Sequence, residues 1–233
     1  MGKIFRHLLL ALMAVVFCAL PGLASADSQI VRGSVSLSEM INNSQTAKTT
    51  DQIILVTGHH LSLWEKQNGF FTETLSSFCG YGRNGLRDAD LRHEGDGTTP
   101  IGVFDIPYAF GIKANPGTTL EYKNVTESSY HSGEPADYNQ WVEVTPGTRD
   151  MSNSEHMMDY QPMYDYGMMI GFNYPKAKLG NGASIFLHVK NPAHSYTAGC
   201  VSVPEDIMVA LLQKCRPGTK IIIVKSDKDV ANY

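Results

Sequence analysis

The sequence predicts a mainly β domain with one clear helix, and two observations lead to this prediction. Short runs of β-branched, aromatic and other apolar residues recur along the chain, several of them next to turn residues such as Asn-Gly. Only one later stretch repeats its apolar residues at the spacing of a well-defined helix. The expected strands cover residues 53–57, 61–65, 70–74, 141–144, 184–188 and 219–224.

The first three expected strands follow one another closely. Residues 53–57 are apolar and β-branched, and residues 61–65 alternate between apolar and polar. Asn68 and Gly69 then form a strong hairpin signal before residues 70–74. This pattern predicts that the domain opens with a strand–turn–strand unit.

The middle of the chain has long irregular stretches. Residues 80–102 are dense in glycine and charge, and residues 115–132 are polar without a clear period. Such stretches in a compact domain usually carry function or cover a cleft. Residues 164–173 are aromatic and apolar, and residues 180–182 form a tight turn before the strand at 184–188.

The expected helix follows Cys200. Ser202 and Glu205 fit a capping box, and Pro204 between them is tolerated in a first helical turn. Pro217 and Gly218 end the helix. Its apolar face combines Ile207, Met208, Leu211 and Leu212.

Residues 1–26 are typical of a secretory signal peptide. Lys3 and Arg6 precede an apolar run, and residues 24–26 form an Ala-Ser-Ala cleavage site. The apolar run is short for a membrane span, although an uncleaved anchor is the alternative. We therefore expect an exported protein. Its N-terminal extension would span residues 27–50, its main domain 51–226 and its C-terminal tail 227–233.

The charge balance argues against a nucleic-acid partner. Removing residues 1–26, which hold two basic residues and no acidic one, changes the formal net charge from −4 to −6. No basic patch is present, and no further apolar run is long enough for a membrane span. The remaining chain of roughly 200 residues suits one well-cored domain, which we expect to be monomeric.

Three cysteines remain after the signal segment, namely Cys79, Cys200 and Cys215. An odd count in an exported protein leaves one thiol over. One arrangement pairs Cys79 with Cys215 and leaves Cys200 free, and the alternative is three reduced, partly buried thiols. We expect no metal and no cofactor, because the chain lacks a Cys-x-x-Cys motif and the adjacent His59 and His60 would point to opposite faces of a strand.

Cys200 and His188 are the candidate catalytic pair. A thiol becomes a good nucleophile when a neighbour takes its proton, and histidine is the usual neighbour at neutral pH. The strand at 184–188 ends in His188, and Cys200 follows shortly after it. The exposed loop around His194 makes that residue a weaker rival base, and the chain has no G-x-S-x-G elbow for a serine nucleophile.

The backbone around Cys200 is expected to complete the site. The N–H groups of Gly199 and Cys200 are the natural donors to an oxyanion, and Gly199 would let the substrate backbone come close. The Val189 carbonyl is a candidate to orient the imidazole. The nearby hydroxyl groups of Ser184, Thr197 and Ser202 are expected to contact substrate.

Three blocks, in this order, resemble the L,D-transpeptidase catalytic domain family of bacterial cell-wall enzymes. Residues 94–104, EGDGTTPIGVF, resemble the family's G-D-x-x-T-P-x-G-x-F segment. Residues 180–188, GNGASIFLH, resemble the strand that ends in the catalytic histidine, and residues 197–201, TAGCV, resemble the nucleophile motif. The resemblance covers roughly residues 51–225. Together with the export signal, it implies a protein of the periplasm or cell wall.

The resemblance implies a β-sandwich-like fold with the cysteine in a cleft. It also implies a thioester with the L-centre of a diamino acid in a peptidoglycan stem peptide, with release of a terminal D-amino acid. By this match Cys200 is the nucleophile and His188 the base, and the amine of a second stem peptide accepts the acyl group. Gly199 and Cys200 would supply the oxyanion N–H groups, and the Val189 carbonyl would orient the ring.

The chain also departs from the family pattern. Val189 follows His188 where many members have glycine, Ala198 replaces a second histidine, and Ser202 stands where many have arginine or asparagine. The interval from His188 to Cys200 is also shorter than usual. These changes leave open a hydrolase of the same fold, such as an L,D-carboxypeptidase or amidase. A non-catalytic wall-binding module is a further alternative.

Overall fold

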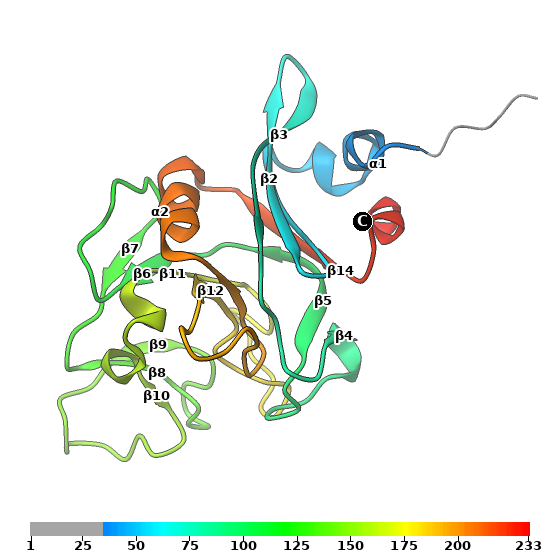
Figure 1. Cartoon of the computed structure of the whole chain (residues 1–233). Coiled ribbons are helices and arrows are strands. Elements are labelled where there is room, and N and C mark those ends of the chain that lie inside the picture. The colour runs from blue at the N-terminus through cyan, green and yellow to red at the C-terminus, as the bar shows by residue number, and fades with distance from the viewer. Residues whose placement is uncertain (1–34) are drawn as a thin grey trace, which may run out of the picture. The chain divides into compact units, whose positions relative to one another are not determined.

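The computed structural model describes residues 35–233, so the signal-peptide prediction lies outside the described residues. The described chain is mainly β, and the expected fold class is confirmed. Its largest sheet has six strands in the order β3-β2-β1-β14-β5-β4 (Figure 1). These strands are β1 (Gln52–Thr57), β2 (His60–Gln67), β3 (Phe70–Phe78), β4 (Leu86–Asp88), β5 (Thr99–Asp105) and β14 (Lys220–Val224).

A five-stranded and a three-stranded sheet make up the rest of the β structure, in the orders β13-β12-β11-β6-β7 and β10-β8-β9. The five strands of the former are β6 (Ala109–Gly111), β7 (Tyr122–Asn124), β11 (Gly167–Met169), β12 (Phe186–Val189) and β13 (Val201–Val203). The three strands of the latter are β8 (Ser129–His131), β9 (Trp141–Glu143) and β10 (Glu155–His156). Several of these short strands lie in the stretches that the sequence left irregular.

The helices of the described chain are short. The α-helices are α1 (Leu37–Asn43) and α2 (Glu205–Lys214). The 3₁₀ turns are η1 (Thr46–Lys48), η2 (Ala89–Leu91), η3 (Met157–Tyr160), η4 (Met163–Asp165) and η5 (Asp227–Asn232). Among residues 35–233, none of these helices has the length and apolar character that a membrane span requires.

The capping box expected at Ser202 is wrong. Ser202 belongs to β13, and α2 begins at Glu205 after Pro204, which makes no side-chain cap. The reason is tertiary, since the Ser202 backbone exchanges both of its hydrogen bonds with Gly80 and is held in an extended conformation. The apolar face of α2 is as expected, with Met208, Leu211 and Leu212 fully buried.

The six-stranded sheet is buried on both faces, which explains the continuous apolar run of β1. Ile54 and Val56 face the main core, which the sheet shares with β12, β13 and α2. Ile53 and Leu55 face a second core that contains Ile41 of α1. Figure 1 shows α1 and the C-terminus on one side of this sheet, with α2 and β12 on the other.

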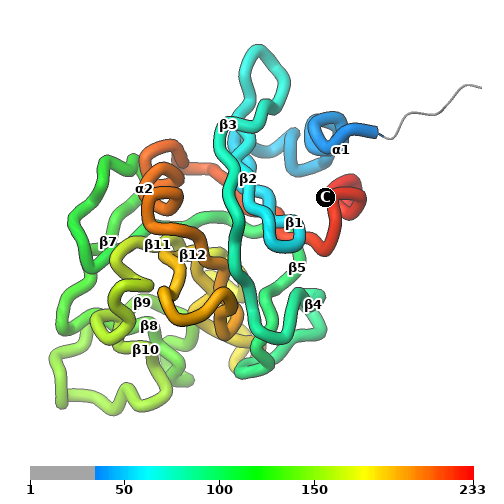
Figure 2. The backbone as a smooth tube through the Cα atoms, viewed as in Figure 1, coloured from blue at the N-terminus to red at the C-terminus, as the bar shows by residue number. Residues whose placement is uncertain are grey.

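The two ends of the described chain lie together. In Figure 2, α1 and the C-terminal turn η5 run side by side, and the two contact each other directly. The Thr46 N–H donates to the carbonyl of Tyr233 over 2.7 Å. Residues 35–50 and the tail from 227 therefore pack on the same face of the sheet.

We expect Ile41→Ala to lower the free energy of unfolding by about 2–4 kcal/mol, because a fully buried side chain is lost from the second core. Leu179→Ala removes a side chain that is 57% exposed and serves as the control, with a change within about 0.5 kcal/mol. Urea unfolding of both variants measures the difference. Equal stability of the two would mean that α1 is not part of the cooperative unit.

Candidate active site

The alternation of side chains along β12 places His188 in the site. Leu187 and Val189 point into the main core, whereas Phe186 belongs to a third core on the opposite face. His188 shares the face of Phe186 because successive side chains of a strand alternate. Its ring packs edge-on against Tyr164, with ring centroids 5.6 Å apart.

Cys200 ends a turn that Thr197 closes. The Thr197 hydroxyl accepts the Gly199 N–H over 3.1 Å and donates to the Cys200 carbonyl over 2.6 Å. The Gly199 N–H therefore already has an acceptor. The Cys200 N–H has no acceptor in the described chain. In this conformation one of the two expected backbone donors is free for an oxyanion.

Thr99 ties this turn to the six-stranded sheet. Its hydroxyl lies 2.6 Å from the Gly199 carbonyl and accepts the Gly82 N–H over 2.9 Å. A Cβ on Gly199 would come within 3.1 Å of the Thr98 carbonyl oxygen, so this close approach favours glycine. The segment that carries the Thr-Pro block is therefore packed directly beneath the cysteine turn.

The Cys200 thiol is buried and bonded to the backbone. Only 9% of Cys200 is exposed. Its sulfur donates to the Ser184 carbonyl over 3.2 Å and accepts the Phe186 N–H over 3.3 Å, and it makes no hydrogen bond to His188 in the described chain. Burial raises the pKa of the thiol to about 12, and the nearby Glu155 carboxyl acts in the same direction. The resting thiol is therefore neutral.

His188 is a neutral imidazole with a fixed tautomer. Its Nδ1 lies 2.7 Å from the Val189 carbonyl oxygen, which can only accept, so Nδ1 carries the proton. Burial lowers the pKa of His188 to about 4. The other ring nitrogen, Nε2, consequently holds a lone pair at neutral pH and is able to accept a proton.

Two pockets meet at Cys200. The first, of about 290 Å³, is lined by His188 and by aromatic residues that include Tyr160 and Tyr164. The second, of about 200 Å³, is lined by Arg92 and by the backbone around Gly182. The residues common to both pockets are Glu155, Ala198 and Cys200. A substrate lying across both would therefore pass over the thiol.

Glu155 is a site residue that the sequence did not indicate. It lies on β10 and receives a hydrogen bond from the Tyr164 hydroxyl over 2.5 Å. Burial raises the pKa of Glu155 to about 7, although the bond from Tyr164 opposes this shift. No motif surrounds Glu155 in the sequence, and only the fold brings it to the cysteine.

The expected substrate-binding hydroxyl groups differ in position. Ser184 lines the second pocket, with its backbone at a φ of +56° and its hydroxyl 2.9 Å from Nδ1 of His131. Thr197 lines the first pocket, but its hydroxyl closes the turn. Ser202 is 2% exposed and lines neither pocket. His194, the rival base, lies exposed at the rim of the first pocket.

The remaining cysteines lie away from the site. Cys79 and Cys215 are both buried in the main core and are free thiols, the state expected in the second of the two alternatives. In residues 35–233, no group of three or more His, Cys, Asp or Glu side chains is placed to hold a metal ion.

The family model of the L,D-transpeptidase catalytic domain, named YkuD, matches residues 51–223. The chain belongs to this family. The match covers all three blocks in which the sequence resembles it. No curated protein sequence matches the chain.

Solved structures of L,D-transpeptidase family members and related proteins also match. Bd1075 of Bdellovibrio bacteriovorus is 17% identical, with a TM-score of 0.41, and the match covers 81% of this chain and 55% of that one. The helical cell shape determining protein Pgp2 of Campylobacter jejuni is 13% identical, with a TM-score of 0.43 and coverage of 84% and 58%. L,D-transpeptidase 1 of Mycobacterium tuberculosis is 11% identical, with a TM-score of 0.36 and coverage of 75% and 62%. The chain thus spans less than two thirds of the length of each of these proteins.

We expect Thr99→Val to lower the free energy of unfolding by about 1–3 kcal/mol, because the Gly82 N–H and the Gly199 carbonyl lose their buried partner. Thr119→Val is the matched control, since Thr119 is exposed and makes only one long contact, of 3.4 Å. Chemical denaturation measures the stability of both variants. A loss of the same size in the control would show that the bonds of Thr99 are not responsible.

We expect the rate of Cys200 alkylation by iodoacetamide to rise from pH 6 to pH 9 without a plateau. The thiolate is the reactive form, and with a thiol pKa of about 12 its fraction grows throughout this range. Mass spectrometry of the Cys200 peptide measures the rate at each pH. A plateau below pH 8 would instead indicate a thiolate–imidazolium pair in the resting protein.

Proposed function

We propose that this chain is an exported cysteine acyltransferase that acts on peptidoglycan stem peptides through a thioester on Cys200. The observation that carries the proposal is that Cys200 and His188 line one pocket in a member of the L,D-transpeptidase family. The pocket has a volume of about 290 Å³, and Tyr160 and Tyr164 form part of its wall. Export follows from the signal-peptide pattern of residues 1–26.

The neutral resting pair shapes the first chemical step. When substrate enters, the thiol must give up its bond to the Ser184 carbonyl and transfer its proton to Nε2 of His188. The thiolate then attacks the carbonyl carbon at the L-centre of the diamino acid, and the Cys200 N–H donates to the oxyanion. The imidazolium that forms is stabilised through the bond from Nδ1 to the Val189 carbonyl.

Collapse of the tetrahedral intermediate completes the first half of the reaction. His188 returns its proton to the departing nitrogen, the C–N bond breaks, and a D-amino acid leaves while the thioester remains. In the second half, His188 takes a proton from an incoming amine, which attacks the thioester and regenerates the thiol. The product is a cross-linked stem peptide or one with an exchanged D-amino acid.

Hydrolysis is the second candidate, and the position of Ala198 favours it. Ala198 lies where the two pockets meet and is exposed, so a small side chain stands beside the thioester where many family members have histidine. Water that reaches the thioester would give a shortened stem peptide. In that case the chain is an L,D-carboxypeptidase or amidase.

We expect the protein to convert tetrapeptide-stem muropeptides, and Cys200→Ala to abolish this conversion because no thioester forms. His188→Ala should reduce it by about 10²–10⁴-fold, the usual contribution of a positioned base. Mass spectrometry of products formed with and without an added D-amino acid separates the candidates. Exchange or dimer formation indicates transfer, whereas loss of the terminal residue alone indicates hydrolysis.

Cys79→Ala is the matched control for this experiment. Cys79 is as well buried as Cys200 but lines neither pocket, so its variant should keep full activity. Conversion that survives in Cys200→Ala would rule out the thioester. No conversion by any form, the natural protein included, would argue against peptidoglycan stem peptides as the substrate.

A further inference from the structure

The second pocket contains a buried cation whose hydrogen bonds are incomplete. Arg92 lines this pocket and is 5% exposed. Its Nε and Nη1 atoms have no hydrogen-bond partner in the described chain, and its Nη2 lies 3.6 Å from the Asp96 carboxylate, too far for a good hydrogen bond. A buried charge with unmatched donors is costly unless a ligand supplies the missing acceptors.

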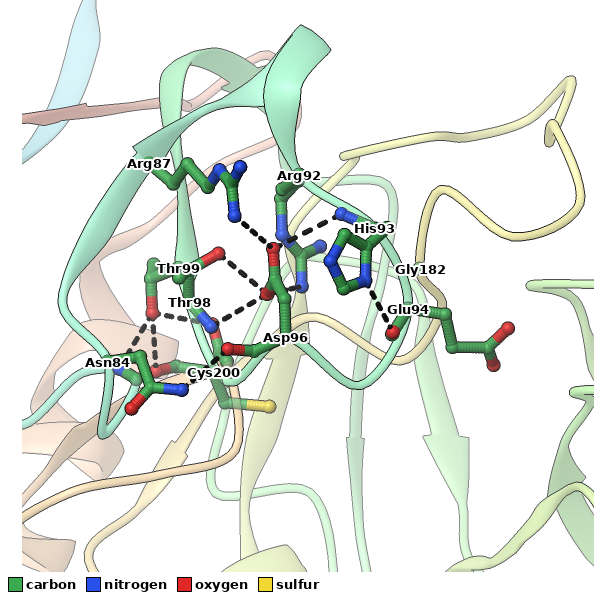
Figure 3. Close-up of polar contacts among 12 residues, drawn as sticks. Asn84, Arg87, Arg92, His93, Glu94, Asp96, Thr98, Thr99, Gly182 and Cys200 are labelled. Carbon is green, nitrogen blue, oxygen red and sulfur yellow. Dashed lines mark hydrogen bonds and ion pairs between the residues drawn. The ribbon is translucent and has the colours of Figure 1, made fainter.

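Asp96 does not satisfy Arg92, because its own oxygens are already occupied. One oxygen accepts the N–H and the hydroxyl of Thr98 over 2.8 and 2.7 Å. The other accepts the His93 N–H over 3.1 Å and lies 3.9 Å from Arg87. Figure 3 shows Arg87 and Arg92 both directed at this carboxylate. Asp96 thus fixes the loop and leaves part of the Arg92 guanidinium unpaired.

The guanidinium is held in place by its surroundings. It lies over the Phe172 ring, 4.8 Å from the centroid. A Cβ on Gly182 would come within 2.8 Å of Nη1, and one on Gly199 within 3.5 Å of Nη2. Both glycines line the second pocket, so the backbone approaches the guanidinium closely on the pocket side. Because Nε and Nη1 are themselves fully buried, Nη2 is the guanidinium atom left to meet a carboxylate in the pocket.

The two sides of the scissile bond in a stem peptide differ in size and charge, and so do the two pockets. The residue on the leaving side of the scissile bond is a single amino acid with a free carboxylate, whereas the acyl side is a longer chain. The smaller pocket, with the cation of Arg92, matches the leaving residue, and the larger aromatic pocket matches the acyl side. Two other charged side chains line the smaller pocket, Glu94 and Glu155. Glu155 accepts a hydrogen bond from the Tyr164 hydroxyl. Glu94 is exposed and would attract an ammonium group.

We propose that the second pocket is a subsite for the free carboxylate of the terminal residue and that Arg92 binds this carboxylate. The inference rests on the proposed function for the identity of the peptide. It makes Arg92 a specificity-determining residue, because only a bond one residue from a free C-terminus would then be placed over Cys200. An incoming D-amino acid would present the same carboxylate to the same subsite.

The test compares N-acetyl-D-alanine with N-acetyl-D-alaninamide in NMR titrations of the full-length natural protein. We expect the acid to bind about tenfold or more tightly than the amide, as a charge-assisted pair requires. Arg92→Gln should bring the two affinities together by weakening the acid alone. Arg87→Gln is the matched control, since Arg87 approaches the same Asp96 but lines neither pocket, and it should keep the preference.

A further variant and the activity measurement help to interpret the titrations. Arg92→Lys, which retains the charge, should preserve part of the preference if Arg92→Gln does not fold. Equal binding of acid and amide by the natural protein would overturn the proposal, as would a preference that Arg92→Gln retains. Binding needs no turnover, so an acid preference in a protein that leaves muropeptides unchanged would refute the proposed function and keep the carboxylate subsite.

Discussion

The structure depends on the register of β12, which lies between two cores. Leu187 and Val189 are packed into the main core, and this packing directs Phe186 and His188 to the opposite face. A slip of one residue would exchange the two sets and place the imidazole among aliphatic side chains. The parallel pairing of β12 with β13 then sets where the turn before β13 delivers Cys200. The core that stabilises the fold therefore also positions His188 and Cys200, the proposed base and nucleophile.

Burial explains the electrostatic state of the site better than any single charge. Removal from water raises the pKa of Cys200 and lowers that of His188, so both groups rest in their neutral forms. This state differs from a preformed thiolate–imidazolium pair, which needs a polar environment. In the proposed reaction, this state makes proton transfer part of the step with substrate. It also protects the thiol from oxidation, which acts on the thiolate.

The sequence predicted the parts of the site that local pattern encodes. The β-branched runs indicated the central strands, and three short blocks indicated Cys200 and His188 together with the family. Glu155 and Arg92 could not be found in this way, because they come from segments without periodicity and reach the cysteine only through tertiary packing. The Ser202 cap failed for the same reason, since pairing with Gly80 outweighed a local helix signal.

The carboxylate subsite bears on the choice between transfer and hydrolysis. Under the proposed function, the departing amino acid and an incoming one carry the same carboxylate, so both would occupy the pocket beside Cys200. An amino acid held there by Arg92 would displace water from that side and present its nitrogen towards the acyl carbon, which would favour exchange over hydrolysis. Water gains access when the pocket is empty, and the exposed Ala198 leaves the way open. The concentration of free D-amino acid would then determine which product a single active site forms.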